Sequence, residues 1–160
     1  PEAAQKAFEE GFAHQNNQKW DDAIASYKRA FELDNSLANA AYNLGLAYKA
    51  KNDLAGAKQA FIQALAIDRN MTKAHYMMAV IHNTQKDNKK AIEHLNNIFR
   101  VEPDYAKAHH LMGVICRESG DIEGARLHFE KYIKLVPNDP FAREAKEWLD
   151  SIRNRQGSGR

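Results

Sequence analysis

The chain of 160 residues is long enough for one compact domain or one short repeat array, and its 44% hydrophobic and 28% charged content is ordinary for a folded soluble protein. Its 23 Lys and Arg nearly balance its 21 Asp and Glu, so no strong field steers it toward nucleic acid or a membrane surface. No apolar run approaches the roughly 18 to 20 residues that span a bilayer, so membrane insertion is not expected. The single cysteine excludes an internal disulfide. It does not identify the compartment: the cytoplasm is favoured, and the periplasm also fits.

A period of 34 residues runs through the chain. In every period an alanine is followed four positions later by a large apolar residue and three positions after that by another apolar residue. This i, i+4, i+7 spacing predicts one amphipathic helix in the latter half of each period. The recurring sets are Ala23, Ala57, Ala91 and Ala125; Tyr27, Phe61, Leu95 and Phe129; Ala30, Ala64, Ile98 and Tyr132; and, continuing the pattern, Leu33, Ile67, Val101 and Leu135.

A second helical segment precedes this one in each period, so every period predicts a helical hairpin. The pattern is clearest in the second unit, at Ala41, Leu44, Gly45 and Tyr48. A single hairpin of this length cannot bury its own apolar face, so we expect the hairpins to stack. The predicted units are residues 4–37, 38–71, 72–105 and 106–139.

Residues that stop helices separate the predicted elements. Asn52 and Gly120 tolerate a left-handed conformation, and each is followed by an aspartate that can cap the next helix. Pro103 and Pro137 end the second helices of the last two units.

A last amphipathic helix is predicted at residues 140–153, because Asp139 can cap it and Pro140 suits its first position. Its apolar side, with Trp148 and Leu149, is expected to cap the stack. Residues 154–160 lack apolar side chains and predict a flexible tail.

The segment Ala41-Tyr-Asn-Leu-Gly-Leu-Ala-Tyr48, followed by Ala57 to Asp68, resembles the tetratricopeptide repeat family. The resemblance covers residues 4–153, and residues 1–153 are expected to form a single array. The other units depart from the family at the first helix, where His75 and His109 replace a large packing residue and Ala79 replaces the glycine. The resemblance implies an all-α, right-handed superhelical solenoid of four hairpins and a capping helix. It also implies that the first helices line a concave groove that holds peptides or partner helices.

The groove positions follow from the rotation of about 100° per residue along each first helix. One column, at Phe8, Tyr42, Tyr76 and His110, is expected to face away from the second helices. One helical turn further along each first helix the groove positions are apolar, and one turn beyond that they are polar. Such a surface suits a ligand with apolar anchors and some acidic character. The predicted peptide-binding residues are Phe8, Phe12, Tyr42, Asn43, Leu46, Lys49, Lys73, Tyr76, Val80, Asn83, Lys107, His110 and Arg117.

Family members that hold the C-terminal carboxylate of heat-shock proteins use a clamp of five Lys, Asn and Arg side chains. Asn43 and Lys73 occupy matching positions here, whereas Phe8, Phe12 and Met77 stand at the other three. The resemblance to this clamp is therefore incomplete.

The seven histidines do not predict a metal site, because they lack the i, i+4 spacing on one face and there is no cysteine pair. Cys116 and His109 are about 10 Å apart along one helix, too far for a nucleophile and its base. We expect no catalytic residue, no metal and no cofactor. His14, His75, His82 and His109 fall at packing positions, which predicts lower stability in acid.

Three functions remain open from the sequence. The first is a non-enzymatic adaptor or assembly scaffold that binds a peptide or helix of a partner protein. The second is a chaperone for secreted or membrane-inserted clients. The third is a self-assembling structural scaffold, in which the groove accepts a second copy of the chain.

Overall fold

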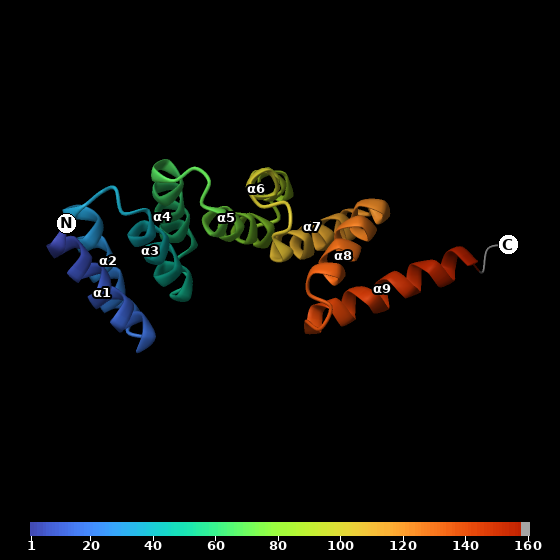
Figure 1. Ribbon diagram of the computed structural model, residues 1–160, viewed down its shortest axis with the longest axis horizontal. Coiled ribbons are helices and arrows are strands. Elements are labelled where there is room, and N and C mark those ends of the chain that lie inside the picture. Colours follow the sequence, from blue (N-terminus) through green and yellow to red (C-terminus); the bar gives the residue numbers. More distant parts are fainter. Residues whose placement is uncertain (158–160) are drawn as a thin grey trace. The chain divides into compact units, whose positions relative to one another are not determined.

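The computed structural model describes residues 1–157, and these residues form only α-helices joined by short turns (Figure 1). The predicted all-α fold of four helical hairpins and a last helix is confirmed. None of the described helices combines the length and the apolar character that a membrane crossing requires. The helices are α1 (Glu2–Asn16), α2 (Trp20–Leu33), α3 (Ala38–Ala50), α4 (Leu54–Ile67), α5 (Thr72–Thr84), α6 (Asn88–Val101), α7 (Ala106–Ser119), α8 (Ile122–Leu135) and α9 (Pro140–Gly157).

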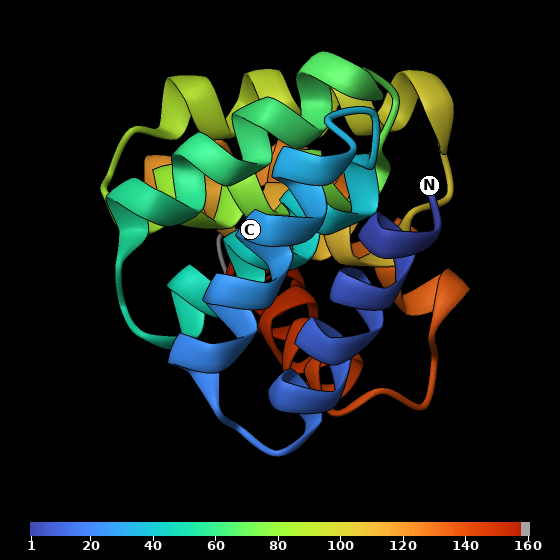
Figure 2. The same cartoon turned by 90° about the vertical axis from the view of Figure 1, so that its left-hand side faces the viewer.

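The helices form two compact units. The first comprises Pro1–Ile81, with the hairpins α1–α2 and α3–α4 and most of α5, and the second begins at His82 and holds α6, the hairpin α7–α8 and α9. The two helices of each of these hairpins lie side by side, as α1 and α2 do in Figure 2. The single array over residues 1–153 stays a prediction.

The second helices bury the residues that the 34-residue period selects. Ala23, Ala57, Ala91 and Ala125 are fully buried, as are the large side chains four positions later. Leu33, Ile67 and Val101, which continue the sequence pattern, are instead 50%, 38% and 44% exposed. Ten residues at about 100° each turn them about 80° away from the alanines, so they leave the packed face.

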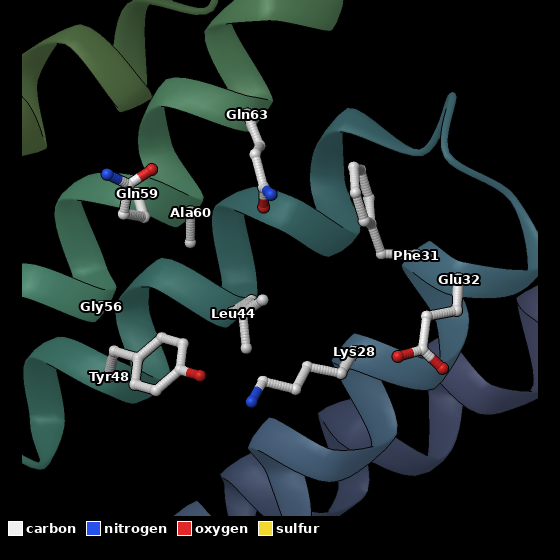
Figure 3. Close-up of a pocket in the computed structure, with 9 residues that line it drawn as sticks. All are labelled: Lys28, Phe31, Glu32, Leu44, Tyr48, Gly56, Gln59, Ala60 and Gln63. Atoms are coloured by element: carbon white, nitrogen blue, oxygen red, sulfur yellow. The ribbon is translucent and has the colours of Figure 1, made fainter.

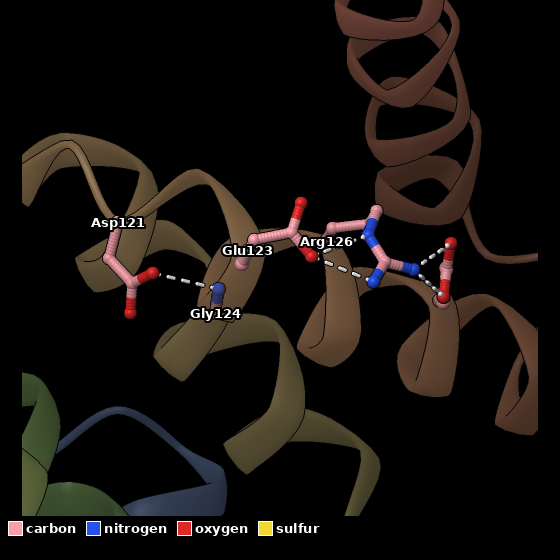
Figure 4. A network of polar contacts seen from close by, with 5 residues as sticks. Asp121, Glu123, Gly124 and Arg126 are labelled. Carbon is pink, nitrogen blue, oxygen red and sulfur yellow. Dashed lines mark hydrogen bonds and ion pairs between the residues drawn. The ribbon is translucent and has the colours of Figure 1, made fainter.

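The turns between paired helices repeat one conformation. Asn52 and Gly120 have positive φ angles of 61° and 84°, as expected, and Gln18 and Lys86 share this conformation at the equivalent positions. The aspartate that follows caps the next helix, because Asp53 accepts a hydrogen bond from the Gly56 amide at 2.8 Å and Asp121 accepts one from the Gly124 amide at 2.9 Å (Figure 4). In the same view Arg126 donates a hydrogen bond to Glu123, and its guanidinium also donates to Glu130 on the next turn of α8.

Glycine in the first helices allows the aromatic ring of the second helix to approach the backbone closely. A Cβ atom at Gly45 would lie 2.6 Å from the Phe61 ring, and one at Gly113 would lie 2.7 Å from the Phe129 ring. Gly11 and Tyr27 have the same relation in the first hairpin. The glycines are therefore required by helix packing.

The last helix, α9, occupies the repeat position of a first helix. Ala40, Ala74, Ala108 and Ala142 recur at intervals of 34 residues and are all fully buried. The Trp148 ring meets the Phe129 ring edge-on at 5.4 Å, and Ala145 is buried with them. The positions that pack against a second helix in the other hairpins carry charges in α9, at Arg143, Lys146, Glu147 and Asp150, and all four are exposed.

The helix α9 extends four residues beyond the end predicted at residue 153. The prediction of a flexible tail is therefore wrong for residues 154–157. Arg153 and Arg155 are good helix formers, and the helix reaches Gly157, a residue that commonly ends helices. Residues 158–160 of the predicted tail lie outside the described residues.

Candidate functional site

The predicted binding residues lie on the first helices α1, α3, α5 and α7, and most of them belong to the first unit. We use the term first-helix surface for the predicted residues of the first unit alone. They come from three helices in turn: Phe8 and Phe12 from α1; Tyr42, Asn43, Leu46 and Lys49 from α3; and Lys73, Tyr76 and Val80 from α5. The second unit holds Asn83, Lys107, His110 and Arg117.

The aromatic column does not face away from the second helices, so that prediction is wrong. The rings of Phe8 and Tyr27 are 5.7 Å apart at 49°, and those of Tyr42 and Phe61 are 5.7 Å apart at 48°. Long side chains on a helix lean over the preceding turn, which brings these rings onto the aromatic of the second helix. They are half-buried, and burial raises the pKa of Tyr42 and also that of Tyr76. This column supports the hairpins as well as lining the surface.

His110 continues the column in the second unit. Its ring centroid lies 6.2 Å from that of Phe129, 5.0 Å from that of Tyr132 and 5.1 Å from that of Phe141. Burial lowers the pKa of His110, and the nearby Arg117 lowers it further, whereas Glu144 raises it. Phe141 comes from α9 at the repeat position of Lys73 and Lys107, a relation that the 34-residue period contains and that the sequence analysis missed.

Arg117 is already engaged within the second unit. Its guanidinium lies 5.7 Å from the centroid of the Phe129 ring and 3.8 Å from the Glu144 carboxylate. The helix α9 therefore contacts two of the predicted binding residues of this unit, His110 and Arg117.

The next turn of the first helices supplies the accessible apolar groups of the first-helix surface. Phe12 is 48% exposed, and Leu46 and Val80 are half-buried. Phe12, Leu46 and Val80 stand at the same position of successive repeats, and an exposed aromatic side chain with partly buried aliphatic ones is the usual composition of an anchor site for a protein ligand.

The polar groups of the first-helix surface centre on Lys73. Its ammonium donates a hydrogen bond to the Asn39 side chain at 2.8 Å and lies 4.4 Å from the centroid of the Tyr42 ring. This contact connects α5 to α3. Asn43 and Lys49, the other polar residues of this surface, are half-buried on α3.

A hollow of about 430 Å³ lies elsewhere on the first unit, between α2, α3 and α4, and the sequence analysis did not find it. In Figure 3 the Lys28 ammonium and the Tyr48 hydroxyl point toward each other on one side of Leu44, and the Gln63 amide points toward Leu44 from the other side. The Lys28 ammonium lies 5.5 Å from the centroid of the Tyr48 ring, so one wall of the hollow is fixed by this contact.

Three of the four histidines expected at packing positions are buried, namely His75, His82 and His109, whereas His14 is half-buried. Among the described residues, no group of three or more His, Cys, Asp and Glu side chains is arranged to hold a metal ion. His109 instead forms a hydrogen bond to His128, with 3.0 Å between their Nδ1 atoms.

Stability is expected to decline in acid. Burial lowers the pKa of His110 and of His128 below the ordinary value of 6.5. The unfolded chain then binds protons first as the pH falls, so this stability is complete above about 6.5 and is lost below it. We expect the thermal midpoint to fall by roughly 2–4 °C between pH 7.5 and pH 5.5. A midpoint that stays constant over this range would show that neither histidine titrates differently in the folded chain.

Sequence models of the tetratricopeptide repeat match most of the chain. One described as TPR repeat matches residues 15–52, and two described as tetratricopeptide repeat match residues 48–115 and 106–139. No family of enzymes is among these matches, and this repeat fold is typically non-catalytic and typically mediates protein–protein interactions. The comparison with individual curated proteins finds no match.

Several solved structures share the fold. A tetratricopeptide repeat protein from Parabacteroides merdae has a TM-score of 0.85 and 16% identity, covering 97% of this chain and 62% of its own. PilF of Pseudomonas aeruginosa has a TM-score of 0.83 and 20% identity, and the match covers 96% of this chain and 70% of PilF. A MamA protein has a TM-score of 0.78 and 23% identity, and the match covers 82% of this chain and 77% of MamA. At these identities the similarity shows the fold alone. Together with the sequence matches, the four hairpins show that the chain belongs to the tetratricopeptide repeat family.

Proposed function

We propose that the chain is a non-enzymatic interaction module, an adaptor or assembly scaffold, that binds a peptide or helix of a partner protein on the first-helix surface. The observation that supports this most directly is the exposed Phe12 ring on α1, at the repeat position where α3 and α5 carry the half-buried Leu46 and Val80 side chains. Phe12 is the most accessible of the three, whereas Leu46 also packs against the core cluster of Ala57 and Phe61.

The partner is expected to carry apolar anchors and some acidic character. Lys73 and Lys49 place ammonium groups on the same surface as Phe12, and Lys107 is an exposed cation of the second unit. Cations at the edge of an apolar site act mainly on the rate of association and on its dependence on salt. A complex through this surface should therefore weaken as the ionic strength rises.

Replacing Phe12 by alanine is expected to separate binding from folding. The side chain is 48% exposed, so the thermal midpoint should change by no more than about 2 °C, the scale of a surface substitution. The loss of an aromatic anchor should weaken the partner complex by about 2 kcal/mol, or roughly 30-fold. Calorimetric titration and thermal unfolding of the same preparation measure both effects.

Tyr42→Ala is the informative comparison for Phe12→Ala. Because the Tyr42 ring packs against Phe61, this variant should lose stability as well as affinity. Equal binding by wild type and Phe12→Ala would contradict the proposed surface.

A chaperone for apolar clients would use the same surface with less selectivity. A peptide array distinguishes the two functions, because an adaptor selects one motif and a chaperone retains many unrelated apolar segments.

A further inference from the structure

A pair of histidines joins the two helices of the last hairpin. The Nδ1 atoms of His109 on α7 and His128 on α8 are 3.0 Å apart, a hydrogen-bond distance. The Phe99 ring covers both imidazoles, with centroids 4.5 Å from His109 and 5.6 Å from His128. His109 is 9% exposed and His128 is half-buried. We call His109 and His128 the histidine pair.

A backbone carbonyl fixes where the protons of the histidine pair lie. The Nε2 atom of His109 is 2.7 Å from the Pro103 carbonyl oxygen, which can only accept, so His109 donates from Nε2. The Nδ1 atom of neutral His109 is then an acceptor. His128 must therefore carry its proton on Nδ1 and donate it to His109.

This arrangement has room for one additional proton but not for two. A proton added to His128 at Nε2 leaves its Nδ1–H bond to His109 in place and makes it charge-assisted. A second proton must go to Nδ1 of His109, the acceptor of that bond. Two N–H groups would then face each other across 3.0 Å between two positive rings, so the rings must separate.

The charged groups around the histidine pair belong to the elements that pack on it. Asp104, in the turn before α7, is near His109 and pairs with Lys131 of α8 at 2.6 Å. Asp121, which caps α8, favours a positive charge on His128. Burial and then the neighbouring His109 outweigh it and lower the pKa of His128. The element α6 contributes the uncharged Phe99 ring.

The same two positions carry histidine in the preceding repeat. His75 and His94 lie 34 residues before His109 and His128, and Nε2 of His75 is 2.9 Å from the Arg69 carbonyl oxygen, the counterpart of the Pro103 oxygen. The first two repeats have small residues there: Ala7 with Ser26, and Ala41 with Ala60. The contact between a first-helix histidine and a backbone carbonyl thus recurs in the third repeat, whereas His94 stacks on the His82 ring with 5.7 Å between the centroids.

We infer that the histidine pair makes the α7–α8 hairpin an acid-sensitive element, which stays closed with one additional proton and opens when a second one binds. Opening moves α7 relative to α8 and so disturbs His110 and Arg117. The inference does not depend on the proposed function, because the first-helix surface is made by residues of the first unit and the histidine pair belongs to the second. The protonation itself is a property of the free chain.

The test is a long-range ¹H–¹⁵N correlation spectrum of the ¹⁵N-labelled full chain, recorded without a partner from pH 7.5 to pH 4.5. The expected result is an Nε2–H form of His109 and an Nδ1–H form of His128 at pH 7.5. As the pH falls, the histidine pair should gain one proton while the α7 and α8 amide signals persist, and gain the second only as they are lost. Two Nε2–H forms at pH 7.5, or two protons gained by a folded hairpin, would overturn the inference.

His128→Gln provides a variant that does not titrate. Its amide can still donate to Nδ1 of His109, so the folded state at pH 7.5 should persist. The fall in thermal midpoint between pH 7.5 and pH 4.5 should shrink by about 2–4 °C. The matched control is His14→Gln, which removes a half-buried histidine of the first repeat and should not reduce the fall. An equal fall in wild type and His128→Gln would contradict the inference even if partner binding behaves as proposed.

Discussion

Truncation after Asp139 is expected to cost about 3 kcal/mol or more of unfolding free energy, or to cause aggregation, because it removes the whole of α9. The helix covers the Phe129 ring with Trp148 and buries Ala142 and Ala145. Without it, the apolar cluster of Ala125, Phe129 and the partly buried residues around them faces water. Thermal unfolding with light scattering measures both outcomes.

A shorter truncation, after Asn154, is the control, since it keeps Ala145, Trp148 and Leu149, which pack with Phe129 of α8. It should unfold at the wild-type midpoint. A monomeric protein of unchanged midpoint after the longer truncation would mean that α9 does not cap the fourth hairpin.

Gly45→Val is expected to lower the free energy of unfolding by about 3 kcal/mol. A Cβ atom there would lie 2.6 to 2.8 Å from three atoms of the Phe61 ring, and the ring is fully buried and cannot withdraw. Replacing a helical glycine normally stabilises a helix by up to about 1 kcal/mol, so a loss isolates the effect of packing. Urea denaturation gives the free energies.

The double variant Gly45→Val with Phe61→Leu should recover part of this loss, because the smaller leucine side chain leaves room for the valine. Ala55→Val, at an exposed position of α4, measures the cost of the branched side chain alone. Additive losses in the double variant would refute the packing explanation.

The repeat architecture could be predicted because its signal is periodic and local. Ala23 and its three counterparts mark the buried face of each second helix. Asn52 and Gly120 tolerate the left-handed turn conformation, and each is followed directly by an aspartate. The exposure of Leu33 was not predicted, because the apolar pattern that begins at Ala23 was extended to Leu33. Ten residues of helix rotate that side chain about 80° away from the packed face.

The candidate site was harder to predict, because side chains of the first helices must be placed relative to two neighbouring helices at once. Tyr42 was expected to face away from the second helix, yet its ring contacts Phe61. Contacts between repeats, such as Lys73 with Asn39, depend on how hairpins stack, which no single hairpin's sequence specifies. The histidine pair was hidden for the same reason, since its members are 19 residues apart.

Self-assembly and partner binding on the second helices are the structural rivals of the proposed function. Ile62 on α4 and Leu127 on α8 are 49% and 58% exposed, so these helices also offer apolar groups to another protein. Ile62 and Leu127 therefore serve as reference positions for locating the surface that binds the partner.

Site-specific photo-crosslinking in the source cells tests the central claim most directly. A benzophenone amino acid placed at Phe12 or Val80 reports contacts of the first-helix surface, and the same group at Ile62 or Leu127 reports contacts of the second helices. The account predicts one shared partner protein crosslinked from residues 12 and 80 and no crosslink to it from residues 62 and 127. The opposite pattern, with crosslinks only from 62 and 127, would contradict the first-helix surface as the binding site.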